Sequence, residues 1–295
     1  MDNLINKGFD VVVLDDFSSG SEKNLSVHVG KSNFHLIKGK IQNRTTAEKA
    51  LEDVEAVFHL AAIVNVDFSV KNPLLVNEVN VDGTLNLLEG CLRSKVEKFI
   101  YASSCAVYGE PEYLPMDESH PTKPLSPYGV SKLAAEHYCQ VIHQLYGIQT
   151  VILRYFNVYG PRQSKGPYSG VISKFIELLK QKKVPLIFGD GSQTRDFVYI
   201  DDVVDANMRV LNCKNCAGRA INIGSGKAAS VKELCDTLLA LYGMHDATPE
   251  HGSAKPGDVK HSCADLCLAE KLFGYKPKFS LEAGLKKLLA EQDKE

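Results

Sequence analysis

The sequence predicts an α/β fold in which a parallel β-sheet is covered by helices on both faces. Short apolar runs alternate with longer helical patterns, which is the order of successive βαβ units. Most of these runs are apolar almost throughout, as expected for strands that are buried on both faces. The 295 residues allow one large domain or two smaller ones.

In the first half, we expect strands over 11–16, 34–39, 55–62, 97–104 and 150–157. Leucine-rich residues 74–93 follow Pro73 and predict a helix. A second helix is expected over 127–146, because Ser126 suits an N-cap, Pro127 suits the first turn and Gly147 suits the residue after the last turn.

After Pro161 the pattern loosens into a smaller lobe. Its strands are expected near 186–188, 196–200 and 220–223, and its helices near 171–182, 202–211 and 230–242. We therefore predict a first domain over 1–160 and a second over 161–295, partly interleaved with the first. The second should cover the carboxyl ends of the strands, where open α/β sheets bind ligands.

Charge and composition exclude several classes of protein. The formal net charge of −2 gives no basic field for nucleic acid, and no apolar run approaches the ~20 residues of a membrane helix. The first ten residues lack the layout of a signal peptide, so we expect a cytoplasmic protein. Eight scattered cysteines suggest free thiols. A zinc site from Cys213, Cys216, Cys263 and Cys267 is the less favoured alternative, so no metal is expected.

Acidic residues end the strand predicted over 11–16. Asp15 and Asp16 stand where an acidic residue of a Rossmann-like unit holds the adenosine ribose of a dinucleotide. The alternative is a simple turn, because DDFSSG is rich in turn-forming residues.

Tyr128 and Lys132 are four residues apart on a predicted helix, so they share one face. An ammonium there favours the phenolate of a tyrosine, whose ordinary pKa is ~10. Ser104 ends a predicted strand and could relay a proton or hold a substrate hydroxyl. The YxxxK spacing alone is common, but the serine-ended strand and the βαβ frame favour a catalytic role.

Seven motifs occur in order: HLAA (59–62), NVDGT (80–84), SSCAVYG (103–109), SPYGVSK (126–132), RYFNVYGPRQ (154–163), GDGSQTRDFVYIDD (189–202) and KPGDVKHSCAD (255–265). Together they resemble the extended short-chain dehydrogenases that act on nucleotide sugars, most closely the UDP-sugar 4-epimerases. The resemblance covers the chain from residue 4 onward.

The resemblance implies roles for individual residues. Tyr128 is the general base and acid, Lys132 lowers its pKa, and Ser104 assists at the sugar 4-hydroxyl. The implied NAD site comprises Asp15, Asp16, Ile41, Leu60, Ala61, Ala62, Asn80, Tyr128, Lys132 and Tyr155. The implied UDP-sugar site comprises Ser104, Asn157, Val171, Arg195, Lys255, Asp258 and Ser262.

Arg195 and Ser262 have more specific expected roles in the substrate site. The planar fork of Arg195 suits phosphate oxygens, although an ion pair with Asp196 or Asp201 is the alternative. By the resemblance, Ser262 occupies the position that gates the pocket beside the sugar 2-substituent. Its small side chain implies room for an N-acetyl group, unless Ser262 merely lies on a surface strand.

The chain departs from the family pattern at its start. A glycine fingerprint is expected about 20 residues before the acidic residue, yet Asp15 has only 14 residues before it, with Gly8 alone among them. We expect the first strand and its Gly-rich loop to be missing. Lys40 replaces the usual aspartate beside adenine, and Lys255 replaces an arginine.

The implied activity is NAD-dependent epimerisation at C4 of UDP-glucose, UDP-galactose or their N-acetylated forms, in a homodimer. A 4,6-dehydratase is disfavoured, because Cys105 and Ala106 replace the Asp-Glu pair that related dehydratases use. A UDP-glucuronate decarboxylase is a third option. The missing loop also allows a non-catalytic relative that has lost tight NAD binding.

Overall fold

The computed structural model describes residues 1–163, 170–253 and 259–292. The chain divides into two compact units, each built from several segments. Unit 1 comprises Met1–Ser103, Ser126–Ile152 and Val210–Ala220, and unit 2 comprises Ser104–Leu125, Leu153–Arg209 and Ile221–Glu295. The division into domains predicted at residue 160 stays a prediction.

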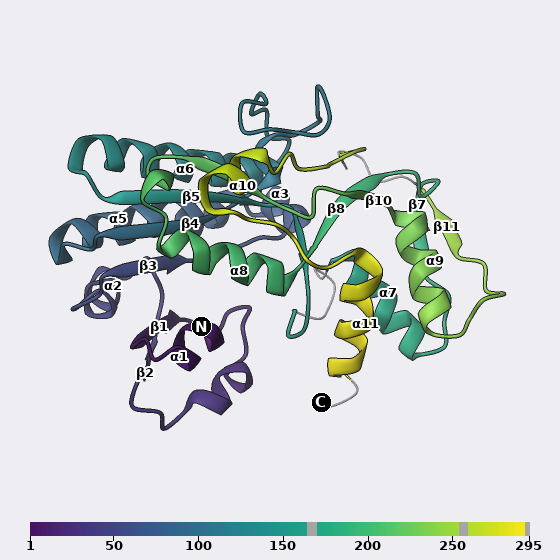
Figure 1. Ribbon diagram of the computed structural model, residues 1–295, viewed down its shortest axis with the longest axis horizontal. Coiled ribbons are helices and arrows are strands. Elements are labelled where there is room, and N and C mark those ends of the chain that lie inside the picture. Colours follow the sequence, from purple (N-terminus) through teal and green to yellow (C-terminus); the bar gives the residue numbers. More distant parts are fainter. Residues whose placement is uncertain (164–169, 254–258, 293–295) are drawn as a thin grey trace. The chain divides into compact units, whose positions relative to one another are not determined.

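The first part of the chain alternates strands and helices (Figure 1). Its elements are α1 (Asp2–Asn6), β1 (Val11–Asp15), β2 (Phe34–Lys38), α2 (Arg44–Ala50), β3 (Ala56–His59), α3 (Val66–Lys71), α4 (Pro73–Asn77), α5 (Gly83–Ser94), β4 (Lys98–Ser104), α6 (Pro127–Tyr146) and β5 (Gln149–Tyr155). All five strands predicted for this half are present, and the run at 55–62 is strand only as far as His59.

Helix α6 follows its sequence signals closely. The Ser126 side chain accepts a hydrogen bond from the Gly129 amide at 3.1 Å, and Pro127 occupies the first turn. Gly147 ends the helix with a φ of +80°, a left-handed conformation that costs glycine little. The prediction of a helix over 127–146 is therefore confirmed.

The helix predicted over 74–93 is present and contains a π-helical turn. A π-helical turn over Glu78–Asp82 separates α4 from α5. It contains Asn80, which is buried and bonded to residues outside its own helix. The prediction of a helix over 74–93 is confirmed, but periodicity did not reveal the local widening of that helix at Asn80.

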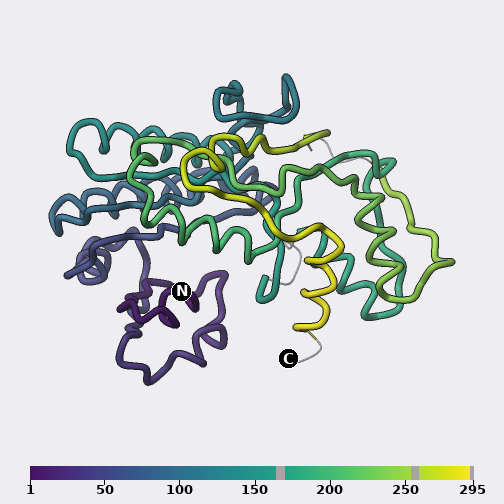
Figure 2. Tube along the Cα trace, viewed as in Figure 1, coloured from purple at the N-terminus to yellow at the C-terminus, as the bar shows by residue number. Residues whose placement is uncertain are grey.

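The parallel strands form two separate sheets at the start of the chain. β1 pairs in parallel with β2, with Val11 opposite Phe34. β3 pairs in parallel with β4, within a sheet of order β3-β4-β5-β9 in which β9 is Ala220–Ile223. Within the described ranges, no strand joins β1 to β3. Figure 2 follows the purple N-terminal trace through β1 and β2.

Two apolar clusters stabilise unit 1. The larger brings together residues of β4, α5 and α6, among them Phe99, Leu88 and Ala135. A smaller one of Ile5, Leu25 and Phe34 lies under β1 and β2. The larger cluster fixes α6 against β4, the two elements that carry Lys132 and the residues it contacts.

The remaining elements lie mostly in unit 2. They are β6 (Asn157–Tyr159), α7 (Val171–Lys180), β7 (Leu186–Phe188), β8 (Thr194–Tyr199), α8 (Ile200–Leu211), β10 (Ala228–Ser230), α9 (Val231–Leu241), β11 (Glu250–Gly252), α10 (Cys267–Phe273) and α11 (Leu281–Gln292). β8 pairs with β6 in parallel and with β10 in antiparallel orientation. A core of α7, α9 and α11 side chains includes Phe175, Leu234 and Leu285.

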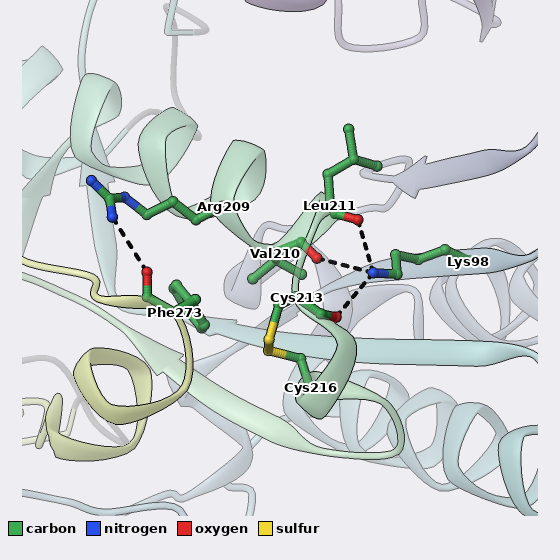
Figure 3. The surroundings of a disulfide bond; sticks show 7 residues. All are labelled: Lys98, Arg209, Val210, Leu211, Cys213, Cys216 and Phe273. Carbon is green, nitrogen blue, oxygen red and sulfur yellow. Dashed lines mark hydrogen bonds between the residues drawn. A yellow bond between two sulfur atoms is a disulfide. The ribbon is translucent and has the colours of Figure 1, made fainter.

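The cysteine prediction needs one correction. Cys213 and Cys216 form a disulfide, whereas free thiols were expected (Figure 3). The Lys214–Cys216 3-10 turn brings their Cα atoms to 5.7 Å, within disulfide range. Lys98 Nζ donates to the carbonyls of Leu211 and Cys213 at 2.8 and 3.0 Å, so the bridged turn is tied to β4. The other six cysteines are free, as predicted.

The helices of the described segments are too short or too polar to cross a membrane.

Candidate active site

Lys132 is a buried cation on the first turns of α6. Only 3% of the residue is exposed, and its Nζ donates to the Ala102 carbonyl of β4 at 2.8 Å. The ammonium also lies 5.0 Å from the centre of the Tyr101 ring. Burial lowers the pKa of Lys132 to about 8, although the neighbouring Glu136 and Cys139 act in the opposite direction. This ammonium is thus placed to titrate near neutral pH.

Tyr128 lies one turn before Lys132 on α6 and is 8% exposed. Its backbone amide donates to the hydroxyl of Ser69 at 3.1 Å. Ser69 is fully buried in α3, so this bond anchors the start of α6 to a neighbouring helix. The phenol and the ammonium share one helix face, as their spacing predicts.

Asn80 holds the segment that follows β3. Its Oδ1 accepts from the Ile63 amide at 2.8 Å, and its Nδ2 donates to the Ile63 carbonyl and to the Ser131 hydroxyl. Leu60 and Ala61 precede this anchor and are exposed, and Ala62 is half-buried. The predicted cofactor segment is therefore an accessible loop on a rigid, buried support.

Asp15 and Asp16 form part of a turn, which was the alternative to a ribose-binding role. Asp15 accepts from the Phe17 amide at 2.7 Å, and Asp16 accepts from the Ser18 amide at 2.9 Å. The hydrogen bond from Ser18 lowers the pKa of Asp16. Both carboxylates remain half-buried at the end of β1, so they shape a turn and still suit ribose hydroxyls. Ile41 is buried and accepts from Asn86 through its carbonyl.

These unit 1 residues fit the nicotinamide and ribose parts of NAD. A buried ammonium, a phenol and two carboxylates are groups that bind ribose hydroxyls. The described residues include no glycine-rich turn between a strand and a helix that would hold the pyrophosphate. Tyr128 and Lys132 therefore suit the nicotinamide ribose, and Asp15 and Asp16 suit the adenosine ribose.

Unit 2 contains Ser104 and Tyr155. The Ser104 hydroxyl accepts from the Ala106 amide at 3.2 Å and caps the short 3-10 turn Cys105–Val107. The Tyr155 hydroxyl donates to Asn207 Oδ1 at 2.9 Å, and burial raises the pKa of Tyr155. Both hydroxyls are thus oriented by neighbours of their own unit.

Two predicted substrate residues of unit 2 carry unpaired buried oxygens. Within the described ranges, Asn157 Oδ1 on β6 and Ser262 Oγ have no hydrogen-bond partner. Ser262 is 4% exposed, and its amide donates to the carbonyl of Thr194, the first residue of β8, which argues against a surface strand. Because an unpaired buried polar group is costly, these two oxygens indicate a place for a polar ligand.

Arg195 extends from β8, where it donates to the carbonyls of Thr194 and Lys260 at 2.8 and 3.4 Å. One of its alternative partners, Asp201, pairs with Lys287 at 2.5 Å. Val171 begins α7 and packs partly against the core of unit 2. Lys255 and Asp258 lie outside the described residues.

Asp196 is a buried carboxylate that the sequence suggested only as an ion-pair partner. It accepts from the amides of Ser225, Gly226 and Ala264 at 2.6, 2.9 and 3.1 Å. Burial raises its pKa. Alternation along a strand places Asp196 and Arg195 on opposite faces of β8. This alternation is the sequence signal that could have predicted that Asp196 is buried and has a structural role, while the neighbouring Arg195 stays accessible.

Residues 1–224 match the NAD dependent epimerase/dehydratase family, so the chain belongs to that family. A putatively assigned UDP-glucose 4-epimerase of Methanocaldococcus jannaschii is 43% identical over 291 residues, which cover 98% of this chain and 92% of that protein.

Solved structures agree with this assignment. UDP-glucose 4-epimerase from Thermotoga maritima, crystallised with UDP-glucose, is 36% identical with a TM-score of 0.93 and covers 99% of this chain and 94% of that one. UDP-glucuronic acid 4-epimerase from Bacillus cereus, in complex with UDP-glucuronic acid and NAD, is 36% identical with a TM-score of 0.90. The match covers 99% of this chain and 93% of that one. The α/β fold with parallel sheets is that of these epimerases.

Proposed function

We propose that this protein catalyses NAD-dependent epimerisation at C4 of a UDP-sugar through a 4-keto intermediate. The observation that carries the proposal is the buried pair of Tyr128 and Lys132, one turn apart on α6, in a chain of the epimerase/dehydratase family. The relatives in M. jannaschii and T. maritima, whose names specify UDP-glucose 4-epimerases, support the sugar nucleotide and the position of the reaction.

In this mechanism Tyr128 takes the proton of the sugar 4-hydroxyl and later returns it. The Lys132 ammonium stabilises the phenolate and binds the nicotinamide ribose, and Ser104 assists at the same hydroxyl. NAD, when bound, supplies the reversible oxidation and reduction of the sugar carbon. Leu60, Ala61, Asp15 and Tyr155 remain proposed cofactor contacts.

The sugar nucleotide is proposed to bind through unit 2. Arg195 suits a phosphate because its fork can donate two parallel hydrogen bonds. Asn157 Oδ1 is proposed to accept a hydrogen bond from the ligand, and the Ser262 hydroxyl to accept or donate one. The small Ser262 leaves room for an N-acetyl group, so we propose that both UDP-glucose and UDP-N-acetylglucosamine are substrates.

The dehydratase alternative is disfavoured by Cys105. Burial raises the pKa of this thiol to about 12, so it stays protonated at neutral pH and cannot act as the base that dehydration needs. Ala106 beside it has no side-chain proton to exchange.

The direct test is incubation of the purified protein with UDP-glucose and, separately, with UDP-N-acetylglucosamine, in the presence of NAD, with products identified by NMR. The expected products are the C4 epimers. A 4-keto-6-deoxy sugar would establish a dehydratase instead. No change of either sugar, with NAD bound, would establish a non-catalytic relative.

We also propose that the complete sheet has one more parallel strand between β1 and β3, followed by a Gly-rich loop. The support is the break between the β1-β2 pair and the β3-β4-β5-β9 sheet. Each unmet backbone group at such a break costs ~1–3 kcal/mol. Supplying such a strand and Gly-rich loop ahead of β1 should tighten NAD binding, and equal affinity of the two forms would contradict the proposal.

A homodimer is proposed through α3, α4 and α6. These helices pack on one another in unit 1 and carry exposed apolar residues: Val66, Val70, Leu74, Leu75, Val130, Tyr138, Val141 and Leu145. Leu74 is 86% exposed and lies within this apolar patch. Large exposed apolar patches are unusual on monomeric proteins and often mark an interface. Light scattering at micromolar concentration should give twice the 32.4 kDa chain mass, and a single-chain mass would contradict the dimer.

A further inference from the structure

Glu136 is a buried carboxylate that none of the assigned roles uses. It lies on α6 four residues after Lys132, and 1% of the residue is exposed. Carboxylates are rarely buried so completely unless they are paired or hydrogen-bonded. Residues four apart on a helix are neighbours on one face, so Glu136 lies directly after the ammonium along the helix.

Glu136 and Lys132 hold two successive residues of β4. The Ser103 hydroxyl donates to Glu136 Oε1. Lys132 Nζ donates to the Ala102 carbonyl at 2.8 Å. The same strand ends at Ser104, the proposed partner of the sugar hydroxyl. Two polar side chains, one turn apart, therefore fix α6 along the last residues of β4.

Three other titratable groups around Lys132, on β3, β4 and α6, are neutral at pH 7. Burial, with the charge of Lys132, lowers the pKa of His59 on β3 to about 3, so its ring is uncharged. Burial raises the pKa of Tyr101 on β4 and of Cys139 on α6, so both keep their protons. Tyr128, the proposed base, is the remaining titratable group on this face of α6. Glu136 is the carboxylate among these described groups, and it counters the effect of burial on Lys132.

We infer that Glu136 is a positioning residue that keeps Lys132 charged and directed along β4, and that through Lys132 it sustains the phenolate of Tyr128. This inference rests on the proposed function for its catalytic consequence. Its electrostatic part concerns Lys132 alone and can be measured without turnover.

The sign of the effect follows from the charges. A nearby anion favours the protonated lysine, and burial disfavours it. Without the carboxylate, Lys132 should lose its proton at a lower pH. Because a neutral lysine no longer stabilises the phenolate, the alkaline limb of the kcat profile should move to lower pH.

The test compares Glu136→Gln with Ser103→Ala, using the full chain with NAD. Glu136→Gln keeps the shape and the capacity to accept from Ser103 but removes the charge. Ser103→Ala removes the hydrogen bond but keeps the charge. We expect the alkaline limb to shift down by about one pH unit in Glu136→Gln and to stay in place in Ser103→Ala. An unmoved limb in both, or an equal shift in both, would overturn the inference.

A second measurement separates this inference from the proposed function. In protein labelled with ¹³C at the lysine ε-carbon, the Lys132 signal is identified by its loss in Lys132→Met. Its titration should move to lower pH in Glu136→Gln, whether or not the protein epimerises a sugar. An unchanged titration overturns the inference. The shifted titration in a protein without epimerase activity refutes only the proposed function.

Folding is checked by far-UV circular dichroism. If Glu136→Gln does not fold, the double variant Lys132→Met with Glu136→Gln takes its place, because it leaves neither charge buried alone. A folded double variant supports the pairing of the two side chains. A double variant that also fails to fold contradicts it.

Discussion

The predicted site residues of unit 1 and unit 2 differ in how their buried polar atoms are satisfied. In unit 1, Lys132 and Asn80 donate or accept at short distances within the protein. In unit 2, Asn157 Oδ1 and Ser262 Oγ are buried without a partner among the described residues. A buried polar group normally has a hydrogen-bond partner. Lys132 and Asn80 therefore have the role of a structural support, whereas Asn157 and Ser262 are suited to bind a ligand.

This difference separates two tasks of the proposed enzyme. The base and its cation must keep one geometry in every cycle, so their bonds are made within the protein. The proposed reaction requires the sugar to present both faces of C4 to the cofactor, so the groups that contact the sugar are better completed by the ligand. Variants of the two sets should therefore fail in different ways.

The largest effect is expected from Tyr128→Phe. The substitution removes only the hydroxyl, and general acid–base catalysis contributes roughly 10²–10⁴-fold, so kcat should fall by that factor. Steady-state kinetics on UDP-glucose measure the change. Tyr146→Phe, at the exposed end of the same helix and outside the proposed dimer patch, is the matched control and should keep its kcat. Retention of more than about a tenth of kcat by Tyr128→Phe contradicts its role as the base.

A smaller and selective effect is expected from Ser262→Tyr. A phenol at this buried position should crowd the N-acetyl group, and overpacking costs ~1–3 kcal/mol. The kcat/KM for UDP-N-acetylglucosamine should fall roughly 10- to 100-fold, while activity on UDP-glucose is kept. Ser262→Ala preserves the small volume and should retain both activities. Equal losses on the two sugars, or none, would remove Ser262 from the gate.

The smallest effect is expected at the Cys213–Cys216 disulfide, which belongs to neither set. It closes a loop of four residues, and chain-entropy arguments give roughly 2 kcal/mol for so short a loop. Replacing both cysteines by serine should lower the free energy of unfolding by about that amount and leave kcat unchanged. A reductant should destabilise the wild type and not the double variant. A large loss of kcat would give the bridge a role in the site.

The sequence predicted much of the fold because its signals are local. The Ser126-Pro127 start and the Gly147 end of α6 act within one turn, and the apolar runs mark every strand of the first half. The spacing of Tyr128 and Lys132 placed both on one face of α6. The ordered motifs indicated the family, which the match over residues 1–224 shows.

The remaining features depend on contacts between distant segments. Asn80 lies in the π-helical turn and forms hydrogen bonds with Ile63 and Ser131. The hydrophobic periodicity of the sequence does not predict these contacts. The Cys213–Cys216 bridge depends on a turn that Lys98 holds from another part of unit 1. Cysteine spacing alone left free thiols and a zinc site as the alternatives.

By itself, the sequence determined the class of fold and the family, and it supplied the residues proposed to carry the chemistry, because each of these signals lies in a short run of neighbouring residues. The tertiary structure decided which polar groups are paired. It buried Glu136 beside Lys132 and bonded it to Ser103, and it left Ser262 Oγ without a partner in the described part of the chain. Burial and long-range hydrogen bonds set the charge of an ionisable group, and both arise only when segments far apart in the chain meet.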